Sequence, residues 1–487
     1  MSSKREGANC TCDGFLSGWC LTVVPPAMND TTASLPLKPV RPLAPSGPCL
    51  AAVRSHYLLP EDEEEEEEGE EAAAEGEQRI WRPGVDELQE GEQLDVEPGT
   101  YDMLHRAQVE WPCLSFDVLR DDLGAQRTTY PMTAYVVAGT QADQVADNRI
   151  YVMKWSRLYR TSKDGREEDD DDEDDESSGD SEDDHEAVLE FKGVPHPGGV
   201  NRIRAMPQAG HIVATWADSG KVHMWNLMGQ RKALDNKAEK YVANPKPIHT
   251  CEAHSQEGFA MDFNPQNTGH FLSGGNDGAI FLWEPVAGGW NVGSSSPFTG
   301  HSGSVEDLHW KRDAGSKAIF ASCGSDHSVR VWDVREKSRS KAAVLISEAH
   351  GCDVNAISWS PCVAELLVSG ADDGSFKIWD TRNTTAGPMA NFRWHRKPVV
   401  SVDWHPTDET VLAVACDDDC ISLWDMAVED DAVGRDGPPG AEHFPPQLLF
   451  LHQGQREPKE LRWHPQLPSV CVSTAGNGFN IFKTCNI

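Results

Sequence analysis

The sequence is short of basic residues and has no long apolar run. Its 487 residues include 43 Lys and Arg against 79 Asp and Glu, and the net charge is −36. A protein with this charge repels nucleic acid and anionic membranes and attracts basic partners. No apolar stretch approaches the roughly 20 residues of a membrane-spanning helix. We therefore expect basic protein partners, no direct binding to nucleic acid and no contact with membranes.

A disulfide framework, a metal site and the common catalytic motifs are missing as well. The thirteen cysteines are odd in number and scattered, which is typical of a protein in a reducing compartment. The close pairs, Cys10 with Cys12 and Cys416 with Cys420, have neither a second pair nor a histidine cluster at zinc-ligand spacing. The sequence contains no phosphate-binding loop, zinc-protease motif or nucleophile elbow. We expect no metal, no cofactor and no catalysis.

Two short tracts hold much of the negative charge. Glu61–Glu71 has ten acidic residues in eleven positions, and Gly165–Glu186 has fifteen acidic residues. The rest of the chain contains 54 acidic residues against 42 Lys and Arg, so it is only moderately acidic. Neither tract has enough apolar side chains to join a core. We predict a disordered tail over residues 1–78 and a solvated acidic insertion over residues 161–186.

What the sequence does contain is a repeat. Six copies each begin near a histidine, continue through alternating apolar residues and a Gly/Asp/Ser turn, and end 29 to 31 residues later at an aromatic residue. These aromatic residues recur at intervals of 45 to 58 residues and are Trp225, Trp283, Trp332, Trp379, Trp424 and Phe482. Short antiparallel strands at this period are typical of the blades of a β-propeller.

Three copies share the same four polar positions. They are His254, Ser273, Asp277 and Trp283; then His301, Ser322, Asp326 and Trp332; then His350, Ser369, Asp373 and Trp379. Ser, His and Asp form the triad of many hydrolases, but a hydrolase needs one triad and this chain has three at near-identical spacing. A structural network, in which the four buried groups satisfy one another's hydrogen bonds, explains the repetition.

Three other copies depart from this pattern. Ser219 stands at the Asp position of the first copy, and Val414 replaces the Ser of the sixth blade. Asn477 and Phe482 replace the Asp and the Trp of the last copy. We expect these blades to be less rigidly held.

A degenerate seventh blade precedes the six copies. Met132–Thr140 and Asn148–Tyr159 resemble two of its strands, whereas the last copy ends five residues after its aromatic residue and lacks an outer strand. We predict that Cys113–Leu119 pairs with the last blade and closes the ring, which removes an exposed edge. The predicted fold is all-β, a seven-bladed propeller over residues 113–487.

The segment before the propeller is predicted to contain a short helix. Tyr101, Leu104, His105 and Gln108 fall at helical spacing, and a Trp-Pro pair ends the pattern. We assign residues 79–112 to an N-terminal arm whose helix packs against the side of the ring.

The repeats resemble the WD-repeat family, and the arm is similar to one branch of that family. "TYDMLHRAQVEWPCLSFDVL" resembles the N-terminal segment of the histone-binding WD proteins of chromatin assembly. "VEDDAVGRDG" and "FPPQLLFLHQG", at and beside residues 427–447, resemble that family's acidic, proline-containing loop. In the family, helix and loop together hold a basic histone helix. The resemblance implies a client-binding site with the apolar residues Leu104, Leu448 and Leu449 and the acidic residues Glu429, Asp430 and Asp431.

A longer resemblance covers residues 79–487. "NRIYVMKW" followed by an acidic insertion, "VPHPGGVNRIRAMP", "GHSGSVEDLHW" and "QLLFLHQGQREPKELRWHP" resemble the glutamate-rich WD-repeat proteins of eukaryotes. The resemblance implies a nuclear and nucleolar protein that takes part in ribosome assembly, chaperones a large-subunit ribosomal protein and binds core histones.

The acidic insertion then has an interpretation. Its acidic residues, among them the run Asp169, Asp170, Asp171 and Asp172, would shield basic clients reversibly. A solvated spacer is the alternative. Ser177 and Ser181 are each followed three residues later by Asp, which fits phosphorylation by a kinase that prefers acidic surroundings.

A second interpretation is a substrate-receptor or adaptor subunit of a cullin-RING ubiquitin ligase. "VWDVR" ends at Arg335 and "IWDTR" ends at Arg382. Both resemble the Trp-Asp-x-Arg box by which WD proteins dock onto cullin-ligase adaptors. The box is less specific than the arm, because Arg after Trp-Asp-x is common in ordinary blades.

Overall fold

The computed structural model describes residues 99–161, 186–292, 296–313, 315–428 and 445–487, and three short strands nearer the N-terminus. These strands are β1 (Ser34–Pro36), β2 (Val53–Ser55) and β3 (Gln93–Asp95). β1 pairs antiparallel with the outer strand of the first blade, and β2 pairs with β3. Most of the predicted tail, of the acidic insertion and of the 427–447 loop lies outside the described residues.

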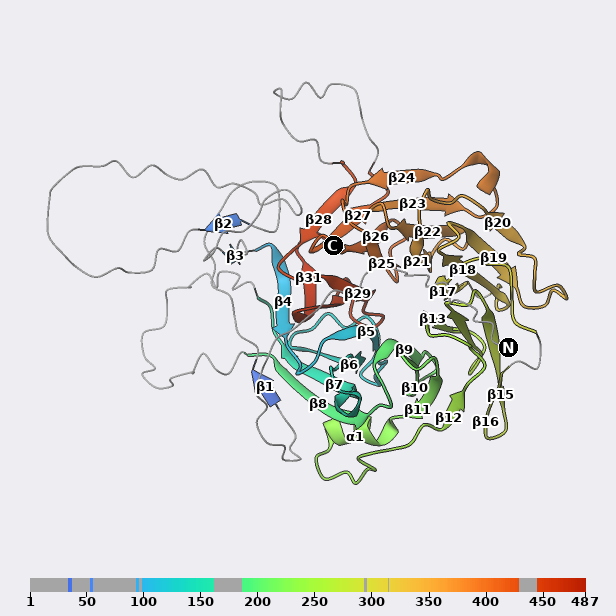
Figure 1. Cartoon of the computed structure of the whole chain (residues 1–487). Coiled ribbons are helices and arrows are strands. Elements are labelled where there is room, and N and C mark those ends of the chain that lie inside the picture. The colour runs from blue at the N-terminus through green and yellow to red at the C-terminus, as the bar shows by residue number, and fades with distance from the viewer. Residues whose placement is uncertain are drawn as a thin grey trace, which may run out of the picture. The chain divides into compact units, whose positions relative to one another are not determined.

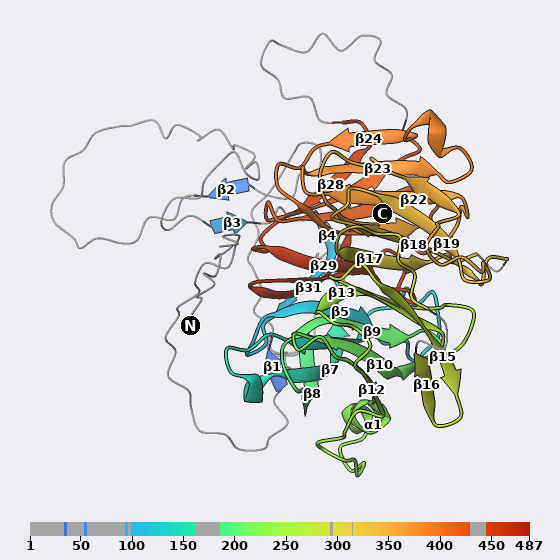
Figure 2. The ribbon, with the colours of Figure 1, turned by 45° about the vertical axis from the view of Figure 1, so that its right-hand side comes forward.

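Seven sheets stand around a common axis as the blades of a propeller, which confirms the predicted fold (Figure 1; Figure 2). From the axis outward, the first four blades consist of β5 (Cys113–Val118), β6 (Met132–Thr140), β7 (Arg149–Leu158) and β8 (Val188–Pro195); β9 (Val200–Met206), β10 (Ala209–Ala217), β11 (Val222–Asn226) and β12 (His249–Cys251); β13 (Gly258–Phe263), β14 (Phe271–Gly275), β15 (Ile280–Val286) and β16 (Gly289–Val292); and β17 (Val305–Trp310), β18 (Ile319–Gly324), β19 (Val329–Asp333) and β20 (Val344–Ile346).

The last three blades follow the same antiparallel order. They consist of β21 (Val354–Trp359), β22 (Leu366–Ala371), β23 (Ser375–Asp380) and β24 (Ala390–Arg393); β25 (Val399–Trp404), β26 (Val411–Cys416), β27 (Cys420–Asp425) and β28 (Leu448–His452); and β29 (Pro458–Trp463), β30 (Cys471–Ala475), β31 (Gly478–Thr484) and β4 (Tyr101–Ala107).

The core lies between neighbouring blades. One cluster, for example, combines Val329 and Val331 of the fourth blade with Trp359 and Trp379 of the fifth. The tight turns between second and third strands need a left-handed residue, and Gly374 has a φ of 75° in one of them. A Cβ atom there would lie 2.3 Å from the carbonyl oxygen of His395, so only glycine fits.

The predicted N-terminal helix is wrong. Tyr101–Ala107 is a β-strand, β4, which pairs antiparallel with β31 as the outer strand of the last blade. Tyr101, Met103 and Ala107 are buried, so the segment has a period of two as well as the helical spacing. The unpaired edge of β31 decides between the two periods, since a strand there satisfies its backbone groups and a helix does not.

An N-terminal strand therefore closes the ring, but it is not the predicted one. Cys113–Leu119 contains β5, which pairs with β6 and lies at the axis in the first blade. The degenerate first blade then has the four strands β5 to β8, two more than its sequence pattern indicates, with β1 added at its outer edge. The ring begins at Tyr101, not at residue 113.

One α-helix occurs among the described residues, α1 (Met228–Asp235), between the third and fourth strands of the second blade. The 3-10 turns Val145–Asp147 and Thr384–Ala386 are the other helical segments of that part of the chain. No helix there is long and apolar enough to cross a membrane.

Candidate functional site

The four-residue polar network of the fourth blade is complete and buried. Trp332 Nε1 donates to Ser322 Oγ at 2.8 Å, and His301 Nε2 lies 2.6 Å from the same oxygen. His301 Nδ1 lies 3.0 Å from Asp326 Oδ1. Burial acts to raise the pKa of Asp326, but hydrogen bonds from His301 and Ser328 hold it below its usual value. Ser322 has no exposed surface. Ser, His and Asp thus follow the order of a hydrolase triad around an oxygen that a substrate cannot reach.

In the third blade the network is looser at its acidic end. Ser273 Oγ accepts a bond from Trp283 at 2.9 Å and lies 2.8 Å from His254 Nε2. Asp277 lies 3.9 Å from His254 Nδ1 and accepts a bond from Ser255 Oγ at 2.8 Å instead. The sequence pattern predicts the members of this network but not which of them bond to one another.

In the fifth blade an additional serine links the acid to the histidine. Ser369 Oγ accepts a bond from Trp379 at 2.9 Å and lies 2.8 Å from His350 Nε2. Ser375 Oγ donates to Asp373 at 2.5 Å and lies 3.0 Å from His350 Nδ1. The side chain of Asp373 therefore orients the histidine through Ser375.

The sixth blade has a complete polar network although Val414 stands at the Ser position, and the expectation that this blade is less rigidly held stays a prediction. Val414 leaves no hydroxyl on the second strand, but Ser422 on the third strand supplies one. Ser422 Oγ accepts a bond from Trp424 at 2.7 Å and lies 2.7 Å from His395 Nε2. Asp418 Oδ2 lies 2.9 Å from His395 Nδ1. The network is complete because a neighbouring strand can place a hydroxyl at the same point in space.

In the last blade the closing strand supplies a partner that the repeat lacks. Tyr101 Oη lies 2.7 Å from His452 Nδ1, and Asn480 Nδ2 lies 2.9 Å from His452 Nε2. Phe482 stacks on His452 with 3.9 Å between the ring centroids. Tyr101 thus joins β4 to the last blade by a buried polar contact as well as by backbone pairing.

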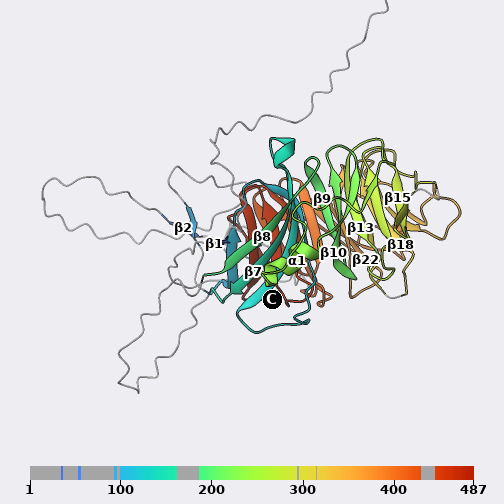
Figure 3. The same ribbon diagram turned by 90° about the horizontal axis from the view of Figure 1, so that it is seen from below.

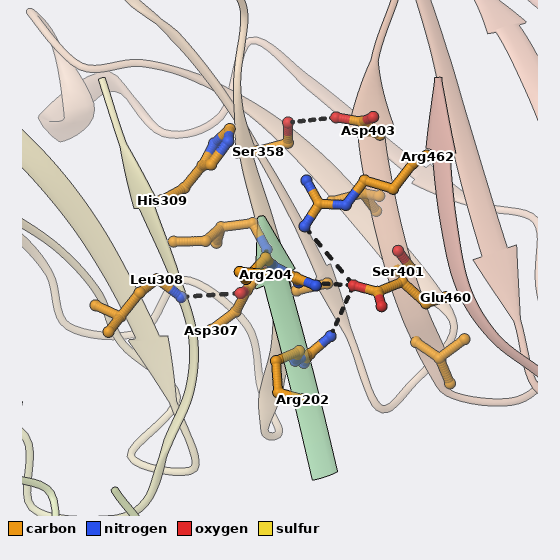
Figure 4. A pocket seen from close by; sticks show the side chains of 14 residues that line it. Arg202, Arg204, Asp307, Leu308, His309, Ser358, Ser401, Asp403, Glu460 and Arg462 are labelled. Carbon is orange, nitrogen blue, oxygen red and sulfur yellow. Dashed lines mark hydrogen bonds and ion pairs between the residues drawn. The ribbon is translucent and has the colours of Figure 1, made fainter. Parts of the chain in front are cut away.

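The pocket that the structure contains at the axis is built around Glu460 (Figure 4). Its Oε1 lies 3.0 Å from Arg202 Nη1, 2.6 Å from Arg204 Nη2 and 3.7 Å from Arg462 Nη2. Its Oε2 accepts bonds from the Ser115 hydroxyl at 2.7 Å and from a backbone N–H of the first blade at 2.9 Å. Burial acts to raise the pKa of Glu460, but the nearby arginines outweigh it and hold the pKa at about 2. One carboxylate therefore joins the seventh, first and second blades.

Other acidic side chains at the axis accept hydrogen bonds from backbone N–H groups of the next blade. Asp262 Oδ2 accepts the backbone N–H of Trp310 at 2.7 Å, and Asp403 Oδ2 accepts that of Trp463 at 3.1 Å. The inner strand of every blade has an edge that faces the axis, and these bonds satisfy donors on it. Burial raises the pKa of Asp262 to about 6. The charged residues of the pocket thus have structural partners within the ring.

Leu104 of β4 lies at a partly exposed apolar surface on the outside of the ring. Leu104, Leu449 and Ile487 are partly buried and pack against one core cluster, which includes Tyr101 and Phe450. Tyr101 and Phe450 meet edge to face at 5.1 Å between centroids. We call Leu104, Leu449 and Ile487 the apolar edge. Leu448, also predicted for the client site, packs instead against the core between the fifth and sixth blades.

Both acidic loops leave the ring close to the apolar edge. The acidic insertion starts after Thr161, whose Oγ1 accepts the backbone N–H of Leu104 at 2.7 Å. The backbone N–H of Thr161 donates to the carbonyl of Asp102 at 2.9 Å, and His105 Nε2 lies 2.9 Å from the carbonyl of Tyr159. The second acidic loop leads directly into β28, which carries Leu449.

Several residues predicted from the sequence lie outside the described residues. They are Asp169, Asp170, Asp171, Asp172, Ser177, Ser181, Glu429, Asp430 and Asp431. The structure does fix the points from which their segments leave and return, which are Thr161 and Glu186 for the insertion and Val428 and Pro445 for the loop.

Arg335 and Arg382 adopt the same conformation in two neighbouring blades. Arg335 Nη2 lies 2.6 Å from Asp333 Oδ2, and Arg382 Nη2 lies 2.6 Å from Asp380 Oδ2. The two arginine side chains are 72% and 70% exposed. Each is therefore held by its own blade and presented to solvent.

Sequence reasoning missed three of the residues that shape these sites. Glu460 gives no signal because, apart from Arg462, its partners lie in the first and second blades, more than 250 residues away along the chain. Thr161 and Ile487 each follow a strand by three residues and belong to no repeat position. Only the missing outer strand of the last blade pointed to a partner from the N-terminal side.

Comparison with known proteins agrees with this geometry. A family model that describes the histone-binding protein RBBP4, or the equivalent component of the CAF1 complex, matches residues 91–159, which contain β4 to β7. The model of the WD domain, G-beta repeat, matches residues 245–284, 293–333, 343–380 and 387–425. The histone-binding model thus covers the closing strand and ends two residues before Thr161, after which the acidic insertion starts.

Three relatives match over most of their length. The ribosome assembly protein rrb1 of Schizosaccharomyces pombe is 39% identical over 418 residues, which is 83% of this chain and 84% of the relative. The protein HEAT STRESS TOLERANT DWD 1 of Arabidopsis thaliana is 42% identical over 434 residues, covering 84% and 92%. The glutamate-rich WD repeat-containing protein 1 of Dictyostelium discoideum is 43% identical over 424 residues, covering 84% and 86%. With its seven-bladed ring and its acidic insertion, the chain belongs to the family of glutamate-rich WD-repeat proteins.

Proposed function

We propose that the chain is a non-catalytic scaffold and acidic chaperone for basic proteins, acting in the nucleus and nucleolus. Its clients are a large-subunit ribosomal protein, core histones or both. The observation that carries the proposal is the bond from the Leu104 N–H to Thr161 Oγ1, which ties the apolar edge to the base of the acidic insertion. The ribosome assembly relative supports a role in ribosome assembly, and the match to the histone-binding model supports histones as clients.

The apolar edge and the two acidic segments contribute to client binding in different ways. Leu104, Leu449 and Ile487 offer apolar contact to one face of a client helix, and such contact contributes affinity in proportion to the area buried. The two acidic segments attract the Lys and Arg residues of the client over a longer range. That attraction is screened by salt, so the client can be released to nucleic acid. Together they give a reversible hold on a protein that would otherwise bind nucleic acid indiscriminately.

The apolar part is tested by Leu104→Ser. We expect about a tenfold loss of affinity for a core histone or a basic ribosomal protein, because one apolar side chain leaves the centre of the contact. The matched control is Leu345→Ser, since Leu345 is 50% exposed on the outer strand of the fourth blade. Leu104→Ser should also lower the melting temperature by a few degrees, because Leu104 packs against a core cluster, so the affinities are compared well below the melting temperatures of both variants. Equal affinities for the two variants would contradict this part of the proposal.

The acidic part is tested by replacing residues 165–186 with a Gly/Ser loop of equal length. We expect weaker client binding and a shallower dependence of affinity on salt, because fewer charge contacts remain to be screened. Titration at two ionic strengths measures both quantities. Unchanged affinity with an unchanged salt dependence would make the insertion a spacer.

A second function has an observation of its own. Arg335 and Arg382 are exposed and held by the aspartates of their own Trp-Asp-x-Arg boxes, which favours docking onto an adaptor of a cullin-RING ubiquitin ligase. Replacing both arginines with Ala should abolish binding to the purified adaptor and leave client affinity unchanged. An original chain that does not bind the adaptor would exclude this function.

A further inference from the structure

A basic loop stands out against the acidic composition of the chain. Residues 227–248, between the third and fourth strands of the second blade, contain five Lys and Arg against two acidic residues. Because the strands alternate in direction in the same order in every blade, the connections from third to fourth strand all lie at one end of the ring. The acidic insertion is the same connection in the first blade. Two neighbouring loops at one end of the ring thus carry opposite charge.

The helix of the basic loop, α1, packs against β7 and β8, the strands on either side of the acidic insertion. α1 contacts β7 and β8, and it lies beside them in the view from below (Figure 3). Asp235 at its end accepts a bond from Tyr135 Oη at 2.6 Å and pairs with Lys154 Nζ of β7 at 3.0 Å. Lys237 Nζ pairs with Glu190 of β8 at 3.2 Å. The basic loop is therefore held against β7 and β8, the two strands that lead into and out of the insertion.

The rest of the basic loop presents cations and an aromatic ring to solvent. Tyr241 packs on α1, and Lys192 Nζ of β8 lies 5.8 Å from the centroid of its ring. Lys240 and Lys246 are exposed and form no ion pair with the described residues. Val242 is 70% exposed. We call Lys192, Lys237, Lys240, Tyr241 and Lys246 the basic surface.

We propose that the basic surface is the docking surface for the chain's own acidic insertion, residues 162–185. Charge complementarity supports this occupant, since fifteen acidic residues lie between Gly165 and Glu186. Attachment supports it too, because the insertion is joined to β7 and β8 at both ends, and an attached partner acts at an effective concentration of about a millimolar. At that concentration, a few exposed ion pairs of modest strength are enough for docking.

The docked insertion competes with a basic client for the same carboxylates. This consequence rests on the proposed function, whereas the docking itself does not. The affinity of the basic surface for the insertion then decides which clients can displace it. A strongly basic client displaces the insertion from the basic surface, and a client with few basic residues does not.

Zero-length carbodiimide coupling of the full chain tests the docking. We expect amide cross-links from Lys240 and Lys246 to the acidic residues of the insertion, and several-fold fewer at high salt because exposed charges are screened. The coupling of Lys237 to Glu190 is the internal standard, because those groups are in contact. Lys337 and Lys341 are the matched controls, being exposed lysines in the same connection of the fourth blade.

Equal coupling of the insertion to the control lysines would overturn the proposal. So would cross-links that join different molecules in a mixture of ¹⁵N-labelled and unlabelled chain, since the surface would then bind the insertion of another copy. Cross-links confined to one molecule and to the basic surface support it.

A binding measurement separates the docking from the proposed function. Replacing Lys240 and Lys246 with Gln should raise the affinity for a core histone by roughly three- to tenfold, because two weak competing ion pairs are lost. The same change at Lys337 and Lys341 should not. If histone does not bind the original chain, the proposed function fails while the cross-links still decide the docking. Lower or unchanged affinity of the double variant, with histone binding by the original chain intact, would overturn the competition.

Discussion

At the scale of single residues, buried polar side chains join strands and blades in addition to the apolar cores. Glu460 is 1% exposed and receives three guanidinium groups, one hydroxyl and one backbone N–H from three blades. The buried serines do the same within single blades, where one oxygen serves both a Trp and a His. Each such group is costly to leave unpaired, so its partners are fixed by the structure around it.

Glu460→Gln should lower the free energy of unfolding by about 3 kcal/mol, because it leaves three partly buried arginines without their common anion. Urea unfolding measures the change. Glu457→Gln is the matched control, since Glu457 is 44% exposed and pairs with Lys459 at the surface; its effect should stay within about 0.5 kcal/mol. Effects of equal size would show that the contacts of Glu460 carry no particular weight.

The same variant should change the dependence of stability on pH. The pKa of Glu460 in the folded state is about 2, below its usual value of 4.5. Its contribution is therefore fully present above pH 4.5 and is lost as the pH falls toward 2, because the unfolded state binds the proton first. The difference in unfolding free energy between the original chain and Glu460→Gln should shrink over that interval. A difference independent of pH would contradict the assignment.

At the scale of elements, the closing strand β4 shows that a local pattern of apolar residues does not always distinguish a helix from a strand. Tyr101–Ala107 satisfies both a helical period and a period of two, and the sequence offers no means to choose. The choice comes from β31, whose edge needs a partner, and from His452, whose ring nitrogen receives the Tyr101 hydroxyl. The clearer alternation of Cys113–Leu119 favours that segment for the same edge, but the first blade needs it at the axis.

Removing residues 1–108 should leave β31 with an open edge and make the chain aggregate, since Tyr101 and Met103 also leave the core. Removing residues 1–78 should leave the protein monomeric. Size-exclusion chromatography and thermal unfolding distinguish the two truncations. A monomeric, cooperatively folded chain that starts at residue 109 would show that β4 is not needed for closure.

At the scale of the whole molecule, much of the negative charge lies in two acidic segments outside the strands of the ring. The ring is held by apolar cores between blades and by buried polar networks, whereas the two acidic segments are attached at its edge. Both segments leave the same end of the ring, one on each side of the last blade, with the apolar edge between them. The client contacts that we propose therefore lie where the N-terminal and C-terminal parts of the chain meet.

The Gly/Ser replacement of residues 165–186 should change the melting temperature by a few degrees at most. The ends of the insertion are held by the pairing of β7 with β8, and a loop of equal length closes at equal entropic cost. Differential scanning calorimetry checks this expectation. A loss of cooperative unfolding would mean that the insertion belongs to the folded ring.

The sequence alone determined the repeat, the number of blades and the polar residues of each blade, because these depend on short-range spacing that recurs. It also determined the charge of the acidic segments, which is a matter of composition. The tertiary structure decided the identity of the closing strand, the replacement of Val414 by Ser422 as the source of a hydroxyl, and the convergence of three arginines on Glu460. These features join residues from different blades or strands, and no local period records which distant group will fill a given edge or satisfy a given buried atom.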